Sequence, residues 1–164
     1  MYHASAEIDD IDRVHLARCV ELARQAVEEG HKPFGSRLVA GNGTVLKEDY
    51  NRTGDGDPTA HPEFALARWA GLNMEPSERA EATVYTSGEH CPMCATAHGI
   101  VGLGRIVYGS STEQLLAWLD ELGVDSFPFK PIPVREVLPN HQVSGPDMTF
   151  ADEIRMLHER VHRR

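Results

Sequence analysis

The chain has 164 residues with a formal net charge of −9, and 41% of its residues are hydrophobic and 25% charged. That length suits a single domain with its own core, and the acidic balance argues against nucleic acid as the main partner, because phosphate binding depends on clustered Lys and Arg. We find no readable secretory signal and no apolar stretch near the roughly 18–20 residues that span a bilayer, so no membrane association is expected.

The first predicted helix follows Asp9 and Asp10 and stops at Gly30, because apolar residues recur every three to four positions between them. The members of this spacing are Ile11, Val14, Val20, Ala23 and Val27. Residues 36–40 and 45–51 predict two strands joined by a hairpin turn at "GNGT". A loop rich in turn formers then leads into a helix over about 61–69.

Strands and helices alternate in the second half. Strands are predicted over 82–88, 104–110 and 132–138, and helices from residue 91, over 111–123 and over 148–162. Such alternation implies parallel strands joined by right-handed crossovers. The expected fold is therefore α/β: a mixed five-stranded sheet covered by helices on both faces, in three α/β/α layers, forming one domain over 1–164.

The cysteines point to a metal site. Three is an odd number, so we expect a reduced, cytoplasmic protein without a disulfide framework. Cys91 and Cys94 have C-x-x-C spacing at a predicted helix start, where both sulfurs can reach one ion and thiolate, the zinc-binding form, is favoured. His61 begins another predicted helix. One imidazole with two thiolates indicates Zn²⁺ rather than Mg²⁺ or Ca²⁺.

Glu63 decides between two kinds of zinc site. A structural clasp needs four protein ligands, for which His90, His98 or a more distant histidine are candidates. Glu63, two residues after His61, can instead stand beside the metal without binding it. A coordinated water next to a carboxylate is the arrangement of metal-assisted hydrolysis, so Glu63 is the candidate catalytic residue.

The motifs "HPE" at 61–63 and "HCPMC" at 90–94 resemble the H-x-E and P-C-x-x-C signatures of the zinc-dependent cytidine deaminase-like superfamily. "DPTAH" and "GRIVYG" are similar to the branch that holds bacterial guanine deaminases, fungal-type cytosine deaminases and tRNA adenosine deaminases. The resemblance extends from about residue 11 to residue 122 and implies the cytidine deaminase-like fold. Pro62 departs from the usual alanine, and His90 from the usual proline.

The resemblance implies roles for the matching residues. His61, Cys91 and Cys94 would bind zinc, and Glu63 would carry the proton from the attacking water to the ring nitrogen and then to the departing amine. The implied substrate-binding residues are Phe34, Gly35, Asn51, Ser87, Glu89 and His90. Asp125 is a further candidate, as a carboxylate that reads an N–H group of the base.

The expected reaction is hydrolytic deamination of a small free nucleobase or related heterocycle, of the guanine or isoguanine, cytosine or 5-azacytosine, or triazine type. A tRNA-specific adenosine deaminase is the alternative, although the net charge of −9 disfavours it. A non-catalytic zinc-stabilised module is the alternative from another class. The Pro-rich loop 123–133 and the C-terminal helix are expected to close the pocket, and residues 115–123 with that helix are expected to form a homodimer contact.

Overall fold

Helices and strands alternate along the chain in a computed structural model that describes residues 6–125 and 127–163. In chain order they are α1 (Asp10–Glu28), β1 (Gly35–Val39), β2 (Val45–Tyr50), the 3₁₀ turn η1 (Thr53–Asp55), α2 (Pro62–Asn73), α3 (Pro76–Glu81), β3 (Thr83–Gly88), α4 (Pro92–Val101), β4 (Ile106–Ser110), α5 (Thr112–Glu121), α6 (Val134–Val137), β5 (Val143–Ser144) and α7 (Ala151–His162). Within the described residues, no helix is both long and apolar enough to span a bilayer.

The five strands form one mixed sheet in the order β2-β1-β3-β4-β5. β1 pairs antiparallel with β2 and β3, whereas β3–β4 and β4–β5 are parallel. A hairpin followed by parallel strands joined by helices is the arrangement predicted from the sequence, so the α/β fold class is confirmed. β3 lies in the middle of the sheet, between the antiparallel and the parallel half.

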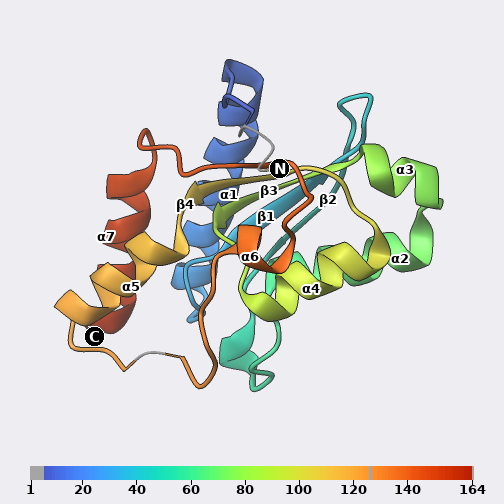
Figure 1. The fold of residues 1–164 in the computed structure, drawn as a ribbon. Coiled ribbons are helices and arrows are strands. Elements are labelled where there is room, and N and C mark those ends of the chain that lie inside the picture. The colour runs from blue at the N-terminus through green and yellow to red at the C-terminus, as the bar shows by residue number, and fades with distance from the viewer. Residues whose placement is uncertain (1–5, 126, 164) are drawn as a thin grey trace.

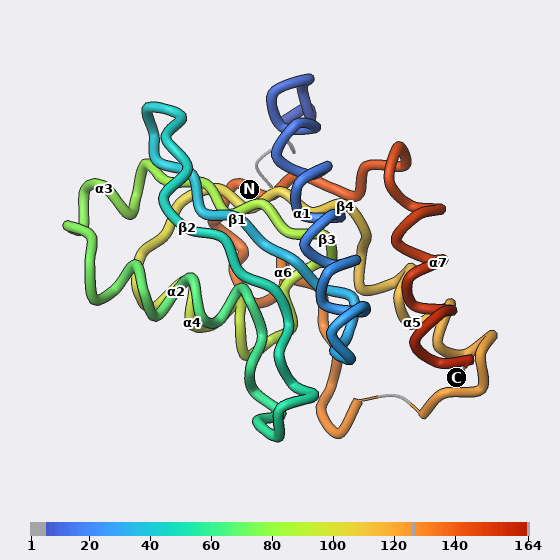
Figure 2. The backbone as a smooth tube through the Cα atoms, turned by 180° about the vertical axis from the view of Figure 1, so that it is seen from behind, coloured from blue at the N-terminus to red at the C-terminus, as the bar shows by residue number. Residues whose placement is uncertain are grey.

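Helices cover both faces of the sheet (Figures 1 and 2). α1 and α7 pack together on one face, and α2 and α4 pack together on the other. Because successive strand residues point to opposite faces, Val84 of β3 packs in the cluster of Leu38 and Leu66, while its neighbour Tyr85 packs in the cluster of Leu16. The sheet therefore separates two cores, one on each side of β3.

The first helix forms as predicted, but its buried face differs from the predicted one at the N-terminal end. Ile11 and Val14 are 69% and 66% exposed, whereas Asp12 is buried. Asp12 lies inside because it shares a capping box with Asp9 and forms an ion pair with Arg105 at 2.9 Å. The spacing of apolar residues could not predict this buried face, because its first residue is a carboxylate that is paired with an arginine.

The strand predicted over 132–138 is wrong. Residues Val134–Val137 form the short helix α6, and the fifth strand is the two-residue β5, Val143–Ser144. Pro133 precedes α6, and the carboxylate of Glu89 accepts a hydrogen bond from its first backbone N–H at 2.7 Å. Alternation over so few residues does not separate a strand from one helical turn. The prediction also omitted α3, a six-residue helix between α2 and β3.

Candidate active site

Two helices on one face of the sheet place metal-ligating groups at their first turns. His61 is the N-cap of α2, and Cys91 is the N-cap of α4, with Cys94 in the turn that follows. Pro62 and Pro92 follow the two caps, at the first helical position, where a backbone N–H has no helical partner. The departure from alanine at Pro62 is thus compatible with the start of α2.

The three groups have the spacing of ligands around one tetrahedral ion. Nδ1 of His61 is 3.6 Å from Sγ of both Cys91 and Cys94, and the two Sγ atoms are 3.5 Å apart. Zinc bonds of about 2.3 Å to sulfur and about 2.0 Å to nitrogen, at tetrahedral angles, separate such atoms by about 3.5–3.8 Å. The residues therefore fit zinc. Among the described residues they are the one group of three or more possible ligands this close together.

The three ligand groups share their protons unequally. The pKa of Cys91 is lowered to about 4, chiefly by its hydrogen bond with Cys94 and further by its contact with His61. His61 has a raised pKa because of the same contact with the Cys91 sulfur. The pKa of Cys94 is raised by its hydrogen bond with Cys91 and by burial. Zinc binds thiolate and neutral imidazole, so its binding here would release the protons of Cys94 and His61.

No histidine completes a four-ligand clasp among the residues that the structure describes. His90 is completely buried, with its ring edge-on to that of His98 at 5.4 Å between centroids. Nε2 of His98 lies 2.8 Å from the carbonyl oxygen of Gly104. Three protein ligands are typical of catalytic zinc sites, which keep a coordination position for water or substrate.

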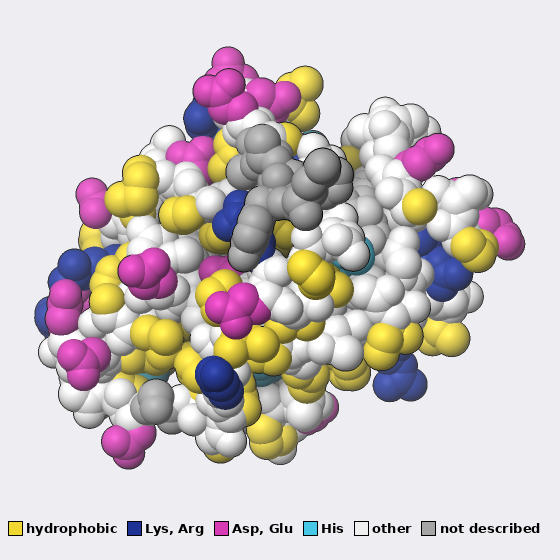
Figure 3. All heavy atoms as spheres, viewed as in Figure 1, with side chains coloured by type: hydrophobic (Ala, Val, Ile, Leu, Met, Phe, Trp, Pro, Cys, Tyr) yellow, Lys and Arg dark blue, Asp and Glu magenta, His cyan; other side chains and the backbone are white. Residues whose placement is uncertain are grey.

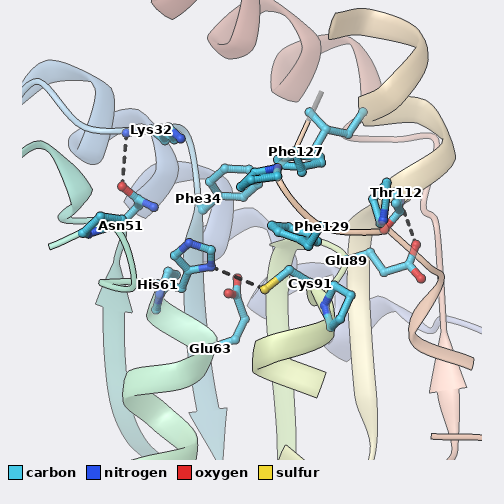
Figure 4. A pocket seen from close by; sticks show the side chains of 16 residues that line it. Lys32, Phe34, Asn51, His61, Glu63, Glu89, Cys91, Thr112, Phe127 and Phe129 are labelled. Carbon is cyan, nitrogen blue, oxygen red and sulfur yellow. Dashed lines mark hydrogen bonds between the residues drawn. The ribbon is translucent and has the colours of Figure 1, made fainter. Parts of the chain in front are cut away.

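Glu63 stands in the first turn of α2, beside the ligand group but outside it. Figure 4 shows its carboxylate between His61 and Cys91. Oε1 accepts hydrogen bonds from the hydroxyls of Thr86 at 2.8 Å and Ser36 at 3.1 Å. Burial raises the pKa of Glu63, and the charge of His61 and the hydrogen bond from Thr86 offset only part of that effect. A buried carboxyl group of raised pKa is suited to accept and release a proton.

A cavity of about 240 Å³ adjoins Glu63 and the ligands (Figure 4). Aromatic rings of Phe34, Phe127 and Phe129 line it, and the last two stack at 5.0 Å between centroids. Its polar lining residues include Lys32, Asn51, Glu89 and Thr112. A mostly apolar wall with a few polar groups is typical of small-molecule sites, and this cavity is smaller than the roughly 300–1,000 Å³ usual for drug-sized ligands.

Asn51 is buried in the cavity wall with its amide orientation fixed. Oδ1 accepts hydrogen bonds from the backbone N–H of Lys32 at 3.3 Å, and from the backbone N–H and hydroxyl of Thr53 at 3.0 and 2.8 Å. These contacts leave Nδ2 on the cavity side (Figure 4). Asn51 therefore offers a hydrogen-bond donor to a bound molecule.

The other predicted substrate contacts lie in different surroundings. Phe34 and Glu89 line the cavity, but both carboxylate oxygens of Glu89 already accept backbone N–H groups, from Thr112 and Val134, at 2.7 Å each. Glu89 thus fixes two helix starts, α5 and α6, at the edge of the site. Its carboxylate holds this part of the wall in place.

Gly35, Ser87 and His90 are buried and do not belong to the cavity lining. Gly35 allows β1 to approach α1, since a Cβ atom there would lie 2.4 Å from the carbonyl oxygen of Cys19. Asp125 is exposed and lines a neighbouring cavity of about 170 Å³. Of the predicted substrate contacts, only Phe34, Asn51 and Glu89 therefore line the cavity.

Sequence reasoning missed part of the site. Lys32, Thr112 and Leu115 line the cavity, and Ser36 and Thr86 contact Glu63. The sequence gives no distinct signal for the last two, because β1 also contains Arg37 and β3 also contains Thr83 and Ser87. The loop expected to cover the pocket supplies four lining residues, whereas α7 contributes to the neighbouring cavity.

Known proteins resemble this chain in sequence. Residues 9–110 match the profile of the cytidine and deoxycytidylate deaminase zinc-binding region. A probable cytosine deaminase of Schizosaccharomyces pombe is 35% identical over 121 residues, which are 73% of each chain. Guanine deaminase of Bacillus subtilis is 33% identical over 134 residues, 79% of this chain and 83% of the relative. Relatives named tRNA-specific adenosine deaminase match as well.

A solved structure shares the fold. Guanine deaminase from Nitrosomonas europaea aligns with a TM-score of 0.72 over 98% of this chain and 87% of that chain, at 18% identity. The matched profile covers more than half of the sequence and contains His61, Glu63, Cys91 and Cys94. The resemblance that these four residues indicated is thereby confirmed. The chain belongs to the zinc-binding cytidine and deoxycytidylate deaminase family.

Proposed function

We propose that the protein is a zinc-dependent aminohydrolase that deaminates a small free nucleobase or a related aminated heterocycle. The observation that carries this proposal is the position of Glu63. Its buried carboxyl group stands beside the ligand group of His61, Cys91 and Cys94, in the wall of a cavity of about 240 Å³. Water, a proton carrier and an enclosed organic substrate are what hydrolytic deamination requires.

Zinc bound by these residues would supply a water molecule whose pKa is near 7 rather than near 16. Glu63 accepts the proton that the water loses as its oxygen attacks the amino-bearing ring carbon. Glu63 then delivers that proton to the adjacent ring nitrogen. It next transfers the proton of the hydroxyl now bonded to the ring carbon to the amine, so that ammonia leaves as the carbon–nitrogen bond breaks and a carbonyl forms. Asn51 donates its Nδ2 hydrogen to an acceptor on the ring, and the aromatic walls exclude bulk water.

Size and polarity of the cavity support a free base of the guanine or isoguanine, cytosine or 5-azacytosine, or triazine type. The space adjoining Glu63 is small, and aromatic rings line it, as suits a flat heterocycle. The names of two relatives, a probable cytosine deaminase and a guanine deaminase, support the same class.

A tRNA-specific adenosine deaminase is the second candidate, because proteins of that name are among the relatives. Charge disfavours it. The chain carries 16 Lys and Arg against 25 Asp and Glu, and Figure 3 shows basic and acidic side chains interspersed on the face in view, without a continuous basic patch among its described residues. A nucleic-acid partner would need such a patch.

We also expect a homodimer in the cytoplasm. The contact predicted from residues 115–123 and the C-terminal helix stays a prediction. Trp118 and Leu157 are buried within the chain itself, but Met156 of the C-terminal helix is 66% exposed. Apolar side chains that remain exposed include Leu72 on α2 and Ile100 on α4, at 77% and 79%. Light scattering coupled to size-exclusion chromatography measures the oligomeric state directly.

The test of the proposed function is ammonia release from purified, zinc-loaded protein. The substrates are guanine, isoguanine, adenine, cytosine, 5-azacytosine and ammeline, their available nucleosides, and a tRNA anticodon stem. Glu63→Gln serves as the blank, and Glu28→Gln, an exposed glutamate at the end of α1, serves as the matched control. We expect turnover of at least one free base, a loss of at least about 10³-fold in kcat for Glu63→Gln, and no loss for Glu28→Gln.

Two results would contradict the proposal. Turnover of the RNA alone would replace the free-base assignment with the tRNA candidate. Bound zinc without turnover of any substrate, or four protein ligands on that zinc, would favour the non-catalytic zinc module.

A further inference from the structure

Two hydroxyl groups form a buried pair beneath Glu63. Ser36 of β1 and Thr86 of β3 are direct partners in the antiparallel pairing of the two strands. Both side chains are completely buried, and Oγ of Ser36 lies 2.9 Å from Oγ1 of Thr86. Polar residues at matched positions of two central strands are costly to bury without a partner, so the pair calls for a role.

Both hydroxyls contact the same oxygen of the candidate catalytic group. Oγ1 of Thr86 is 2.8 Å and Oγ of Ser36 is 3.1 Å from Oε1 of Glu63. The sheet thus holds one carboxylate oxygen from two strands, while α2 carries the backbone of Glu63. The side chain that lines the cavity is therefore fixed at both ends, by its helix and by its carboxylate oxygen.

We infer that Ser36 and Thr86 are positioning residues for turnover: they hold Oε1 of Glu63 so that its other oxygen is presented to the reacting atoms in the cavity. This inference rests on the proposed function. It assigns the two hydroxyls no contact with the substrate, since neither residue lines the cavity. Their effect is on the geometry of proton transfer, which depends on sub-ångström placement of the transferring group.

A hydroxyl pair suits this role better than a fixed cation would. Each hydroxyl carries one hydrogen that rotates to suit its acceptors. Thr86 has a second acceptor, the carbonyl oxygen of Gly88 at 2.9 Å, and Ser36 has a second acceptor in Oγ1 of Thr86. The pair can therefore direct both hydrogens at Oε1 or turn one away, and it restrains the carboxyl group without adding a charge.

The competing explanation is that the pair only joins β1 to β3. A merely structural pair would affect stability and leave turnover of the folded enzyme unchanged. Steady-state kinetics separates the two readings, because loss of positioning lowers kcat while KM, set by substrate contacts elsewhere, stays constant.

The test compares four variants of the zinc-loaded protein. Thr86→Val removes the hydroxyl at nearly constant volume, Thr86→Ser retains it, and Ser36→Ala removes the partner. Ser144→Ala is the matched control, because its hydroxyl is equally buried but lies on β5, bonded to the Ala6 carbonyl oxygen at 2.7 Å.

We expect kcat to fall about 30-fold in Thr86→Val and about tenfold in Ser36→Ala, with KM within about twofold of the parent. Thr86→Ser should recover kcat to within about threefold, and Ser144→Ala should retain the parental kcat. Zinc content should equal that of the parent in all four. Parental kcat in Thr86→Val and Ser36→Ala, or an equal loss in Ser144→Ala, would overturn the inference.

A crystallographic measurement decides the question without activity. In Thr86→Val the Glu63 carboxyl group should rotate or become disordered, whereas in Thr86→Ser it should keep the parental position. An unchanged Glu63 in Thr86→Val would also overturn the inference. If the parent deaminates none of the substrates, the proposed function fails, and the position of Glu63 still shows whether the hydroxyl pair holds it.

Discussion

Two buried carboxylates, Asp12 and Glu63, lie on opposite faces of β3. Each accepts a hydrogen bond from one of two consecutive residues of that strand. Asp12 on the α1 side accepts a hydrogen bond from the hydroxyl of Tyr85 at 2.8 Å and a two-pronged contact from Arg105 at 2.9 and 3.0 Å. Glu63 on the α2 side has no arginine or lysine among its hydrogen-bond partners in the described residues, and Thr86 serves it with a hydroxyl. One carboxylate is paired with a cation, and the other is held by neutral groups.

The difference appears in the charge that each group prefers. Burial by itself would raise the pKa of Asp12, but the hydrogen bonds from Arg105, the Asp9 backbone and Tyr85 outweigh it, so that the pKa is lowered. Burial raises the pKa of Glu63, and its partners do not reverse the effect. A buried carboxylate that is paired with a cation stays ionised and has a structural role. A buried carboxylate that is held only by neutral hydrogen bonds can accept and release a proton.

Removing the charge of each carboxylate should separate the two roles most widely. Asp12→Asn leaves Arg105 without its counter-charge and should lower the free energy of unfolding by about 3 kcal/mol, with kcat of the folded enzyme unchanged. Glu63→Gln should not lower the unfolding free energy. Urea titration followed by circular dichroism measures both. Asp10→Asn, at a fully exposed position, should cost less than about 1 kcal/mol; equal losses for Asp10→Asn and Asp12→Asn would show that the buried pair contributes nothing special.

A third buried group, His158 on α7, has no acidic partner among the described residues, and the ring of His162 stacks beside it at 6.5 Å between centroids, where its charge adds to the effect of burial. The ring of His158 packs against Phe34 and Trp118, and burial lowers its pKa from 6.5 to about 3. The unfolded chain therefore binds a proton between these values that the folded chain does not. Stability should fall as the pH drops from 6.5 toward 3, by up to about 1.4 kcal/mol per pH unit from this residue.

The measurement for His158 is the unfolding free energy at several pH values, compared with His158→Gln. The variant should lose stability less steeply below pH 6.5 and should match the slope of the parent above it. Identical slopes across the whole range would mean that His158 titrates normally in the folded protein.

The smallest expected effect compares neighbours on β3. Tyr85→Phe removes one hydrogen bond to Asp12 while its contact with Arg105 remains, so the unfolding free energy should drop by about 1 kcal/mol. Turnover should not change. Thermal unfolding and the ammonia assay are applied to both Tyr85→Phe and Thr86→Val. We expect Tyr85→Phe to lower stability without changing kcat, and Thr86→Val to lower kcat. A loss of kcat in Tyr85→Phe would contradict the assignment of a purely structural role to the Tyr85 hydroxyl.

The parts of the molecule that were predictable depend on short sequence distances. The spacing of Cys91 and Cys94 and that of His61 and Glu63 lie within single helical turns, so each pair could be recognised locally. That the two pairs meet was inferred from their shared zinc chemistry and from the family signature, because His61 and Cys91 are 30 residues apart. The mixed sheet, a hairpin followed by parallel strands, followed from the alternation of elements. Where the local pattern was too short, as at α6, the assignment was wrong because one helical turn and a short strand look alike.

The parts that were not predictable depend on register between distant segments. Ser36 and Thr86 are 50 residues apart, and Asp12 and Arg105 are 93 apart. No spacing rule reports such contacts, because they arise only when strands and helices pack. The exposure of Ile11 and Val14 has the same origin, since the buried ion pair of Asp12 turns that end of α1.

The alternation of residues along β1 and β3 has a practical meaning for laboratory evolution of this enzyme. Arg37, Val39 and Tyr85 face α1, whereas Ser36, Leu38 and Thr86 face α2. Libraries at the first set would act on the core beneath α1. In the second set, Ser36 and Thr86 contact Glu63, whereas Leu38 belongs to the core beneath α2, so only the two hydroxyl positions would address catalytic rate. A single-residue insertion in β3, by contrast, would exchange the two sets beyond it and disturb the core and the catalytic contacts at once.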